Sequence, residues 1–134
     1  MSSIFTKIIA GEIPSYKVYE DKHTYAFLDI HPIQKGHTLV IPKVEVDHLL
    51  DVPEPYYSAC FTTAKIVGNI LQQSLNPQRI GMKVIGFDVP HAHIHMVPMY
   101  NQADMYTQPA DTVDHEALAA VHAEILAHIN TLDK

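Results

Sequence analysis

The stretch "HAHIHMVP", residues 91–98, places a histidine at every second position. Successive side chains of a β-strand point to opposite faces, so a strand here would hold His91, His93 and His95 on one face of a sheet. The other face would carry apolar side chains, those of Ala92, Ile94 and Met96. The apolar face can cover a hydrophobic core, which leaves the histidine face free for chemistry.

Sequence patterns around the histidine row predict a mixed fold. Short apolar or alternating runs between turn residues predict five strands, at residues 16–20, 24–30, 37–42, 79–85 and 92–99. Apolar residues at helical spacing predict three helices, at residues 4–10, 56–75 and about 118–129. Asp114 is placed to cap the last helix. One central helix between runs of strands, followed by a C-terminal helix, favours an α+β fold with a mostly antiparallel sheet.

The composition predicts one soluble domain over residues 1–134. The chain is 47% hydrophobic, and its length is close to that of one typical domain. We find no run of roughly 20 apolar residues that would span a membrane and no secretory leader, and the single cysteine, Cys60, excludes an internal disulfide. The formal charge of −6 and the lack of a basic run argue against nucleic acid and anionic membranes as partners. We therefore expect a cytoplasmic protein that binds neither.

A metal site is the first alternative to catalysis, because imidazole is a common metal ligand. On a regular strand that rises about 3.3 Å per residue, the outer Cβ atoms of His91 and His95 lie roughly 13 Å apart. Zinc–nitrogen bonds are about 2.0–2.1 Å long, so three such histidines cannot easily reach one ion. Two of them could, if His37 or Asp88 supplied the missing ligands. The spacing therefore disfavours a metal without excluding it.

Nucleophilic catalysis is the interpretation that we favour. A histidine can form a covalent intermediate when one neighbour fixes its tautomer and another group assists the leaving atom. Neighbouring imidazoles in one row can supply both. Phosphoryl transfer suits such a site, because its rate depends on positioning and on donors aimed at the phosphate oxygens.

The motif "HAHIHMV" resembles the His-φ-His-φ-His-φ-φ signature of the histidine triad (HIT) family, in which φ is a hydrophobic residue. Two further stretches, "IFTKIIAGEIPSYKVYED" and "YAFLDIHPIQKGHTLVIPK", resemble the N-terminal half of its HINT branch, which contains nucleotide-binding, phosphoramidase-like proteins. The similarity covers about residues 4–99, and residues 100–134, expected to be a loop and the C-terminal helix, lie outside it. This resemblance implies an α+β homodimer with one active site per subunit.

The resemblance also implies catalytic roles for four histidines. His93, the middle histidine, would attack the α-phosphorus of a nucleotide and form a nucleotidyl-histidine that water then hydrolyses. The backbone carbonyl of His91 would accept a hydrogen bond from the protonated ring nitrogen of His93. His95 would contact the phosphate or the leaving group, and His37 would support the row from behind.

A purine nucleotide is the substrate that the resemblance implies. Asp29 would accept both ribose hydroxyls, and a carboxylate is well suited to two neighbouring donors. An apolar pocket would receive the base, and its expected members are Phe5, Ile8, Phe27, Leu28 and Ile30.

Two positions depart from the family pattern. Many members have Gly-Gln-Ser or Gly-Gln-Thr before the triad, whereas this chain has Phe87 and Asp88 after its glycine. Because a carboxylate beside a phosphate repels it, we expect Asp88 to pair with a histidine of the row or with a protonated amine of the leaving group. Some relatives bind zinc through Cys-x-x-Cys, and these positions are Ser3 and Thr6 here. We therefore expect no metal and no cofactor.

The favoured function is that of a nucleotide phosphoramidase or nucleotidyl hydrolase. A dinucleoside polyphosphate hydrolase is the second possibility. It would need additional cations, for which Lys43 and Lys83 are the nearby candidates. A nucleotide-binding or partner-binding adaptor with residual hydrolysis is the third.

Overall fold

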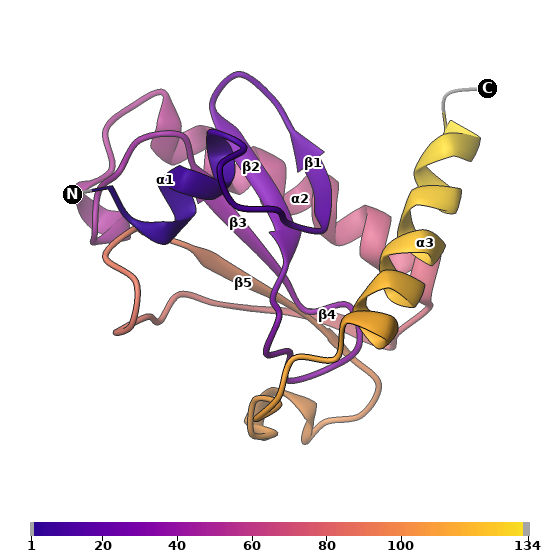
Figure 1. The fold of residues 1–134 in the computed structure, drawn as a ribbon. Helices are drawn as coiled ribbons and strands as arrows, with labels where there is room; N and C mark the ends of the chain where they lie inside the picture. The colour runs from indigo at the N-terminus through magenta and orange to yellow at the C-terminus, as the bar shows by residue number, and fades with distance from the viewer. Residues whose placement is uncertain (1, 133–134) are drawn as a thin grey trace.

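The fold is a five-stranded antiparallel sheet with helices on both faces. In the computed structural model, which describes residues 2–132, the strands follow the order β1-β2-β3-β5-β4 (Figure 1). Their bounds are Lys17–Glu20 (β1), Thr24–Leu28 (β2), Thr38–Pro42 (β3), Arg79–Lys83 (β4) and Ile94–Met99 (β5). The helices are Ile4–Ile9 (α1), Tyr56–Leu75 (α2) and His115–Leu132 (α3), with short 3-10 turns at Leu49–Asp51 and Asp104–Tyr106. The predicted α+β fold is confirmed.

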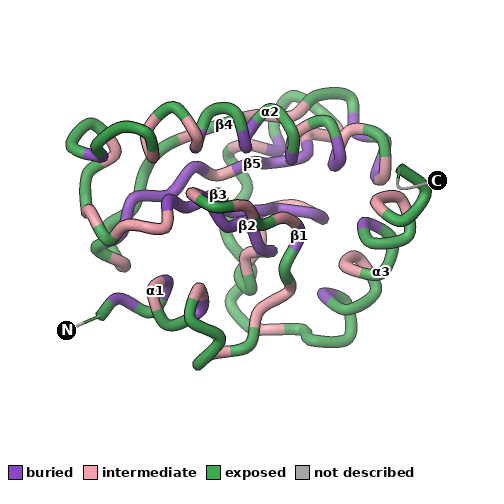
Figure 2. The backbone as a smooth tube through the Cα atoms, turned by 90° about the horizontal axis from the view of Figure 1, so that it is seen from above, coloured by how far each residue is buried: buried purple, intermediate pink, exposed green. Residues whose placement is uncertain are grey.

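The sheet separates two hydrophobic clusters, because its strands alternate. α1 lies on one side of the sheet and α2 on the other (Figure 2). Ala26 and Leu28 of β2 pack into the larger core with α2 and α3. Tyr25 and Phe27 alternate with these two residues along β2 and pack into the smaller cluster with α1. We call the surface on which α1 lies the α1 face, and the functional site is built there.

The helix boundaries agree with the predictions for physical reasons. α2 spans the predicted residues and ends at Asn76, which is left-handed (φ 54°), and Pro77 then supplies no backbone donor. α3 starts earlier than its first predicted apolar residue, because Asp114 caps it: its Oδ1 accepts the N–H of Ala117 at 3.0 Å. No helix within residues 2–132 has the length and apolar content needed to cross a membrane.

The predicted strand at residues 92–99 is too long at its start. β5 begins at Ile94, because the N–H of Ala92 donates to the carbonyl of Val46 at 2.7 Å, outside the sheet. Only His95 of the triad therefore lies on a strand, and His91 and His93 precede it.

Two other predicted strands end early. β2 ends at Leu28 rather than at residue 30, since Asp29 forms a turn in which its Oδ1 accepts the N–H of His31 at 2.8 Å. β4 ends at Lys83 rather than at residue 85. The residues that follow β2 and β4 therefore lie outside the sheet, where they line the functional site.

The strand register brings four residues into one row across the sheet. Phe27 lies opposite Leu39, Leu39 opposite His95, and His95 opposite Lys83. Directly opposed residues of antiparallel strands have side chains on the same face. Because Phe27 and Leu39 pack against α1, the whole row lies on the α1 face.

Candidate active site

A cleft of about 890 Å³ opens on the α1 face. Among the residues that line it are ten of the eleven predicted site residues: Phe5, Ile8, Phe27, Leu28, Asp29, Ile30, His37, Asp88, His93 and His95. The eleventh, His91, is buried outside the cleft. The structure therefore brings together candidates that are separated by up to 90 positions in the chain.

His93 is held with one ring nitrogen free. Its Nδ1 lies 2.8 Å from the carbonyl oxygen of His91, which can only accept, so Nδ1 carries the proton and Nε2 keeps its lone pair. The edge of Phe5 packs against the ring, with centroids 5.2 Å apart and planes at 90°. This is the arrangement that a nucleophilic imidazole requires.

The backbone at Gly86 closes against His93. A Cβ atom at this position would lie 2.7 Å from Nε2 and 2.4 Å from Cε1 of His93. Both distances are far below van der Waals contact, so only glycine lets the chain pass this close to the ring. The loop after β4 therefore contacts the proposed nucleophile through its backbone.

The buried ring of His91 makes hydrogen bonds to two separate segments of the chain. Its Nε2 lies 2.8 Å from the carbonyl of Pro42 and therefore donates, which leaves Nδ1 to accept the hydroxyl hydrogen of Ser3 at 3.0 Å. Burial lowers the pKa of His91, which favours this neutral form. His91 thus joins the end of β3 to α1, and its carbonyl orients His93.

A hydroxyl and carboxylate network surrounds Ser3. The Oγ of Ser3 caps α1 by accepting the N–H of Thr6 at 3.1 Å. Glu45 Oε1 accepts the backbone N–H of Ser3 at 2.6 Å and the hydroxyl of Thr6 at 2.7 Å, and these two donors lower the pKa of Glu45. With hydroxyls in place of thiolates, and with His91 Nδ1 committed to Ser3, this donor set does not fit the nitrogen and sulfur ligands of structural zinc.

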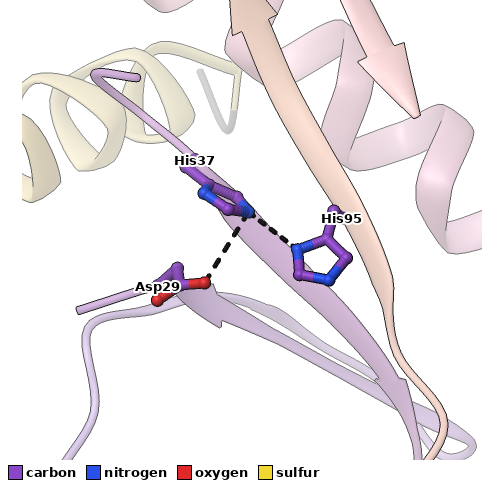
Figure 3. A group of neighbouring side chains, drawn as sticks. All are labelled: Asp29, His37 and His95. Atoms are coloured by element: carbon purple, nitrogen blue, oxygen red, sulfur yellow. Dashed lines mark hydrogen bonds and ion pairs between the residues drawn. The ribbon is translucent and has the colours of Figure 1, made fainter. Parts of the chain in front are cut away.

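His37 and His95 form an ordered hydrogen-bond chain (Figure 3). The N–H of Ile33 donates to His37 Nδ1 at 3.1 Å, so His37 carries its proton on Nε2. This Nε2–H donates to His95 Nδ1 at 2.9 Å. His95 Nε2 in turn donates to the carbonyl of Ile85 at 2.8 Å. Each imidazole in the chain is neutral and has one defined tautomer.

The site favours neutral groups. Burial, with the nearby charge of Lys83, lowers the pKa of His37 to about 3, and burial also lowers the pKa of His95. Burial raises the pKa of Asp29, although the N–H of His31 opposes the shift. Asp29 Oδ2 lies 3.7 Å from His37 Nε2 (Figure 3), but His37 is neutral and the contact is therefore not an ion pair.

Asp29, His37 and His95 are also close enough to be tested as a metal site. One ligand atom from each lies within 4.8 Å of the others. A histidine that binds a metal through Nε2 donates its Nδ1–H to a second group. His37 Nδ1 instead accepts the N–H of Ile33, so these residues do not fit a metal ion.

Asp88 lines the cleft as predicted, but its side chain lacks the expected histidine partner. It is exposed and makes no hydrogen bond or ion pair with any residue of the described part of the chain. The predicted pairing with a histidine of the row is therefore absent, and the alternative partner, a protonated amine of the leaving group, stays a prediction. The loop meets His93 through the Gly86 backbone, and the side chains that follow are exposed, with Phe87 at 93%.

Leu28 and residues 108–111 also differ from the sequence analysis. Leu28 borders the cleft, but its side chain packs in the larger core on the opposite face from Phe27. Residues 108–111 form an unpredicted wall of the cleft. They are held there by Ala110, whose N–H donates to Pro32 at 3.1 Å and whose carbonyl accepts His31 Nδ1–H at 2.9 Å. These contacts join distant loops that have no periodic sequence pattern.

The low pKa of His37 predicts acid sensitivity. An unfolded histidine titrates near 6.5, so below that pH the unfolded chain binds a proton that folded His37 does not. The free energy of unfolding should therefore fall as the pH drops from about 6.5 toward 3, by up to about 1.4 kcal/mol per pH unit from this residue. Urea unfolding at pH 7.5 and 5.5 measures this change. The free energy of unfolding should fall less between these pH values in His37→Gln than in wild type. The exposed His48 provides the control, His48→Gln, and equal pH dependence in wild type and His37→Gln would contradict the analysis.

Comparisons with known proteins identify the family of the chain. The sequence model of the HIT domain matches residues 10–102. Adenosine 5'-monophosphoramidase HNT1 of Saccharomyces cerevisiae is 35% identical over 133 residues, covering 97% of this chain and 84% of that protein. The Hit-like protein of Bartonella henselae has a TM-score of 0.82 at 29% identity, covering 95% of this chain and 96% of that one. A zinc-bound histidine triad protein of Mycobacterium smegmatis has a TM-score of 0.77 at 27% identity, covering 98% of both. The chain belongs to the HIT family.

Proposed function

We propose that this protein is a nucleotide phosphoramidase or nucleotidyl hydrolase that acts at the α-phosphate of purine nucleotides through a covalent nucleotidyl-His93. The observation that carries the proposal is the proton order of His93, whose Nδ1–H donates to the carbonyl of His91 and whose Nε2 keeps its lone pair, in a residue that lines the cleft. The name of the yeast relative, an adenosine 5'-monophosphoramidase, supports the same reaction class.

The reaction proceeds in two displacements. His93 Nε2 attacks the α-phosphorus, the bond from phosphorus to the leaving nitrogen breaks, and the amine departs after taking a proton from solvent. Water then attacks phosphorus, the bond to Nε2 breaks, and a water proton returns to solvent. His95, whose ring centroid lies 4.9 Å from that of His93, would contact the phosphate by turning its Nε2–H from the carbonyl of Ile85 to a phosphate oxygen. The carbonyl of His91 holds the attacking tautomer throughout.

The nucleoside occupies the part of the cleft next to α1. Phe5 and Phe27 pack edge to face there, with centroids 5.4 Å apart, and offer an apolar surface to a base. Asp29 stands at the end of β2, where its carboxylate can accept ribose hydroxyls. Base and ribose recognition together hold the α-phosphate against His93.

Short substrates are favoured over dinucleoside polyphosphates. Of the two cations considered for additional phosphates, Lys43 is bound to Glu20 at 2.7 Å and lies outside the cleft. Lys83 lines the cleft. One cation suffices for one phosphate but is too few for a polyphosphate chain.

A second copy of the chain is the partner that we propose for the edge of the sheet. β4 has one free edge, and unpaired edges invite strand pairing. Apolar side chains are exposed along and just beyond it: Met82 (48%), Val84 (50%), Ile85 (53%) and Phe87 (93%). A homodimer would cover them.

The covalent step predicts an adduct on His93. Wild type mixed with adenosine 5'-phosphoramidate and quenched in acid-free denaturant should show an adenylyl adduct by mass spectrometry, and His93→Ala should show none and lose turnover. A missing nucleophile costs several kcal/mol of barrier, so we expect a loss of at least about 10³-fold. Retained turnover in His93→Ala would contradict the mechanism, and nucleotide binding by wild type without turnover would identify an adaptor.

The position of Asp29 predicts sugar selectivity. Adenosine monophosphate should bind better than its 2′-deoxy form by about tenfold or more, since a charge-assisted hydrogen bond contributes on the order of 1.5–3 kcal/mol. Asp29→Asn should remove most of this preference, and it should weaken binding of the ribonucleotide more than binding of the deoxynucleotide, which keeps its 3′-hydroxyl. Calorimetry on both ligands measures it, and equal affinities in wild type would reject the assignment.

The apolar edge predicts dimerisation. Wild type should sediment at twice its 15.0 kDa monomer mass at micromolar concentration. Val84→Asp should shift it to the monomer, because the change buries a carboxylate in the proposed interface. Leu50→Asp is the matched control. Leu50 is 86% exposed and is distant in sequence from β4, so this variant should remain dimeric. A monomeric wild type would refute the dimer.

A further inference from the structure

Lys83 occupies a position next to the proposed chemistry. It is the last residue of β4 and lies directly opposite His95 in the β4–β5 register. Opposed side chains share a face of the sheet, so Lys83 projects from the α1 face beside His95. It lines the same cleft as His93 and His95. Its charge also contributes to the lowered pKa of both His37 and His95.

The charges around the cleft set Lys83 apart. Among the described residues that line it, Asp29, Asp88 and Asp111 are acidic, and Lys83 is the one lysine or arginine. The chain as a whole has a formal charge of −6. A phosphate entering this site therefore meets one permanent cation and three carboxyl groups.

Three other lysines pair with carboxylates outside the cleft. Lys17 and Lys43 both pair with Glu20, at 3.1 and 2.7 Å, and Lys35 pairs with Glu124 at 3.2 Å. Within residues 2–132, Lys83 has no carboxylate within 4.0 Å. Its ammonium group is available to a ligand.

The loop after β4 supplies few other donors. Phe87 has no polar atom, and the carboxylate of Asp88 accepts hydrogen bonds but does not donate them when ionised. Both side chains are exposed. A phosphate bound at His93 thus lacks side-chain donors from this loop, although phosphoryl transfer depends on donors and cations at the phosphate oxygens.

We propose that Lys83 is a phosphate-binding catalytic residue, whose Nζ contacts the non-bridging oxygens of the α-phosphate between His93 and His95. The inference rests on the proposed function and adds the group that neutralises charge in its transition state. An ammonium group is a compact point charge that can follow these oxygens as the phosphorus moves toward His93.

The test separates phosphate contact from folding. Lys83→Gln, Lys83→Met and Lys83→Arg are compared with wild type and with Lys43→Gln, which removes the same charge outside the cleft. Lys83→Gln and Lys83→Met should lower kcat/KM for adenosine 5'-phosphoramidate by about 10²-fold, whereas Lys43→Gln should stay within about fivefold of wild type. Lys83→Arg keeps the charge and should lose less activity than Lys83→Gln. The affinity for adenosine monophosphate should fall about tenfold in the first two variants, with adenosine unaffected.

Several results would overturn the proposal. These are an equal loss of affinity for adenosine and its monophosphate, unchanged kcat/KM in Lys83→Gln, or the same loss in Lys43→Gln. A loss confined to substrates whose leaving group is itself a phosphate would place Lys83 on the leaving group and reject the α-phosphate contact. If wild type failed to hydrolyse the phosphoramidate, the proposed function would fail, but the comparison of the two binding affinities would still decide the role of Lys83.

Discussion

The hydrogen bond from His93 Nδ1 to the carbonyl of His91 is the constraint on which the site depends. At 2.8 Å it fixes both the ring orientation and the tautomer, so that Nε2 keeps its lone pair in a residue that lines the cleft. The carbonyl itself is immobilised from two directions. The ring of His91 donates to Pro42, and the next residue, Ala92, donates to Val46. The ring of the first histidine of the row thus serves structure, and the second is the residue to which we assign the chemistry.

The site is also ordered from the opposite side by neutral imidazoles. His37 accepts from Ile33 and donates to His95, which donates to Ile85. Every proton in this chain of hydrogen bonds has one position, and burial lowers the pKa of the His37 and His95 rings. Such order limits reorganisation when charge develops on a bound phosphate, which is the condition under which preorganised groups contribute most to catalysis.

The sequence predicted elements better than side-chain directions. The alternation of the histidine row correctly placed Ile94 and Met96 in the core, and the apolar spacing of α2 gave its full extent. Alternation alone could not show that β5 starts after His93, because a hydrogen bond to the distant Val46 ends the ladder. For the same reason the sequence could not predict that residues 108–111 line the cleft or in which direction Asp88 points. Both depend on loop contacts that leave no local periodicity.

The row from Leu39 through His95 to Lys83 ties the electrostatics of the site to strand pairing. Side chains of a strand alternate with a period of two, so a slip of β4 by one position would turn Lys83 into the core and present Met82 or Val84 beside His95. β4 is paired to β5 along one side only. The pairing of this edge strand therefore matters as much as the identity of its residues: a protein that folded with a misaligned β4 would keep its histidines and lose this cation from the site.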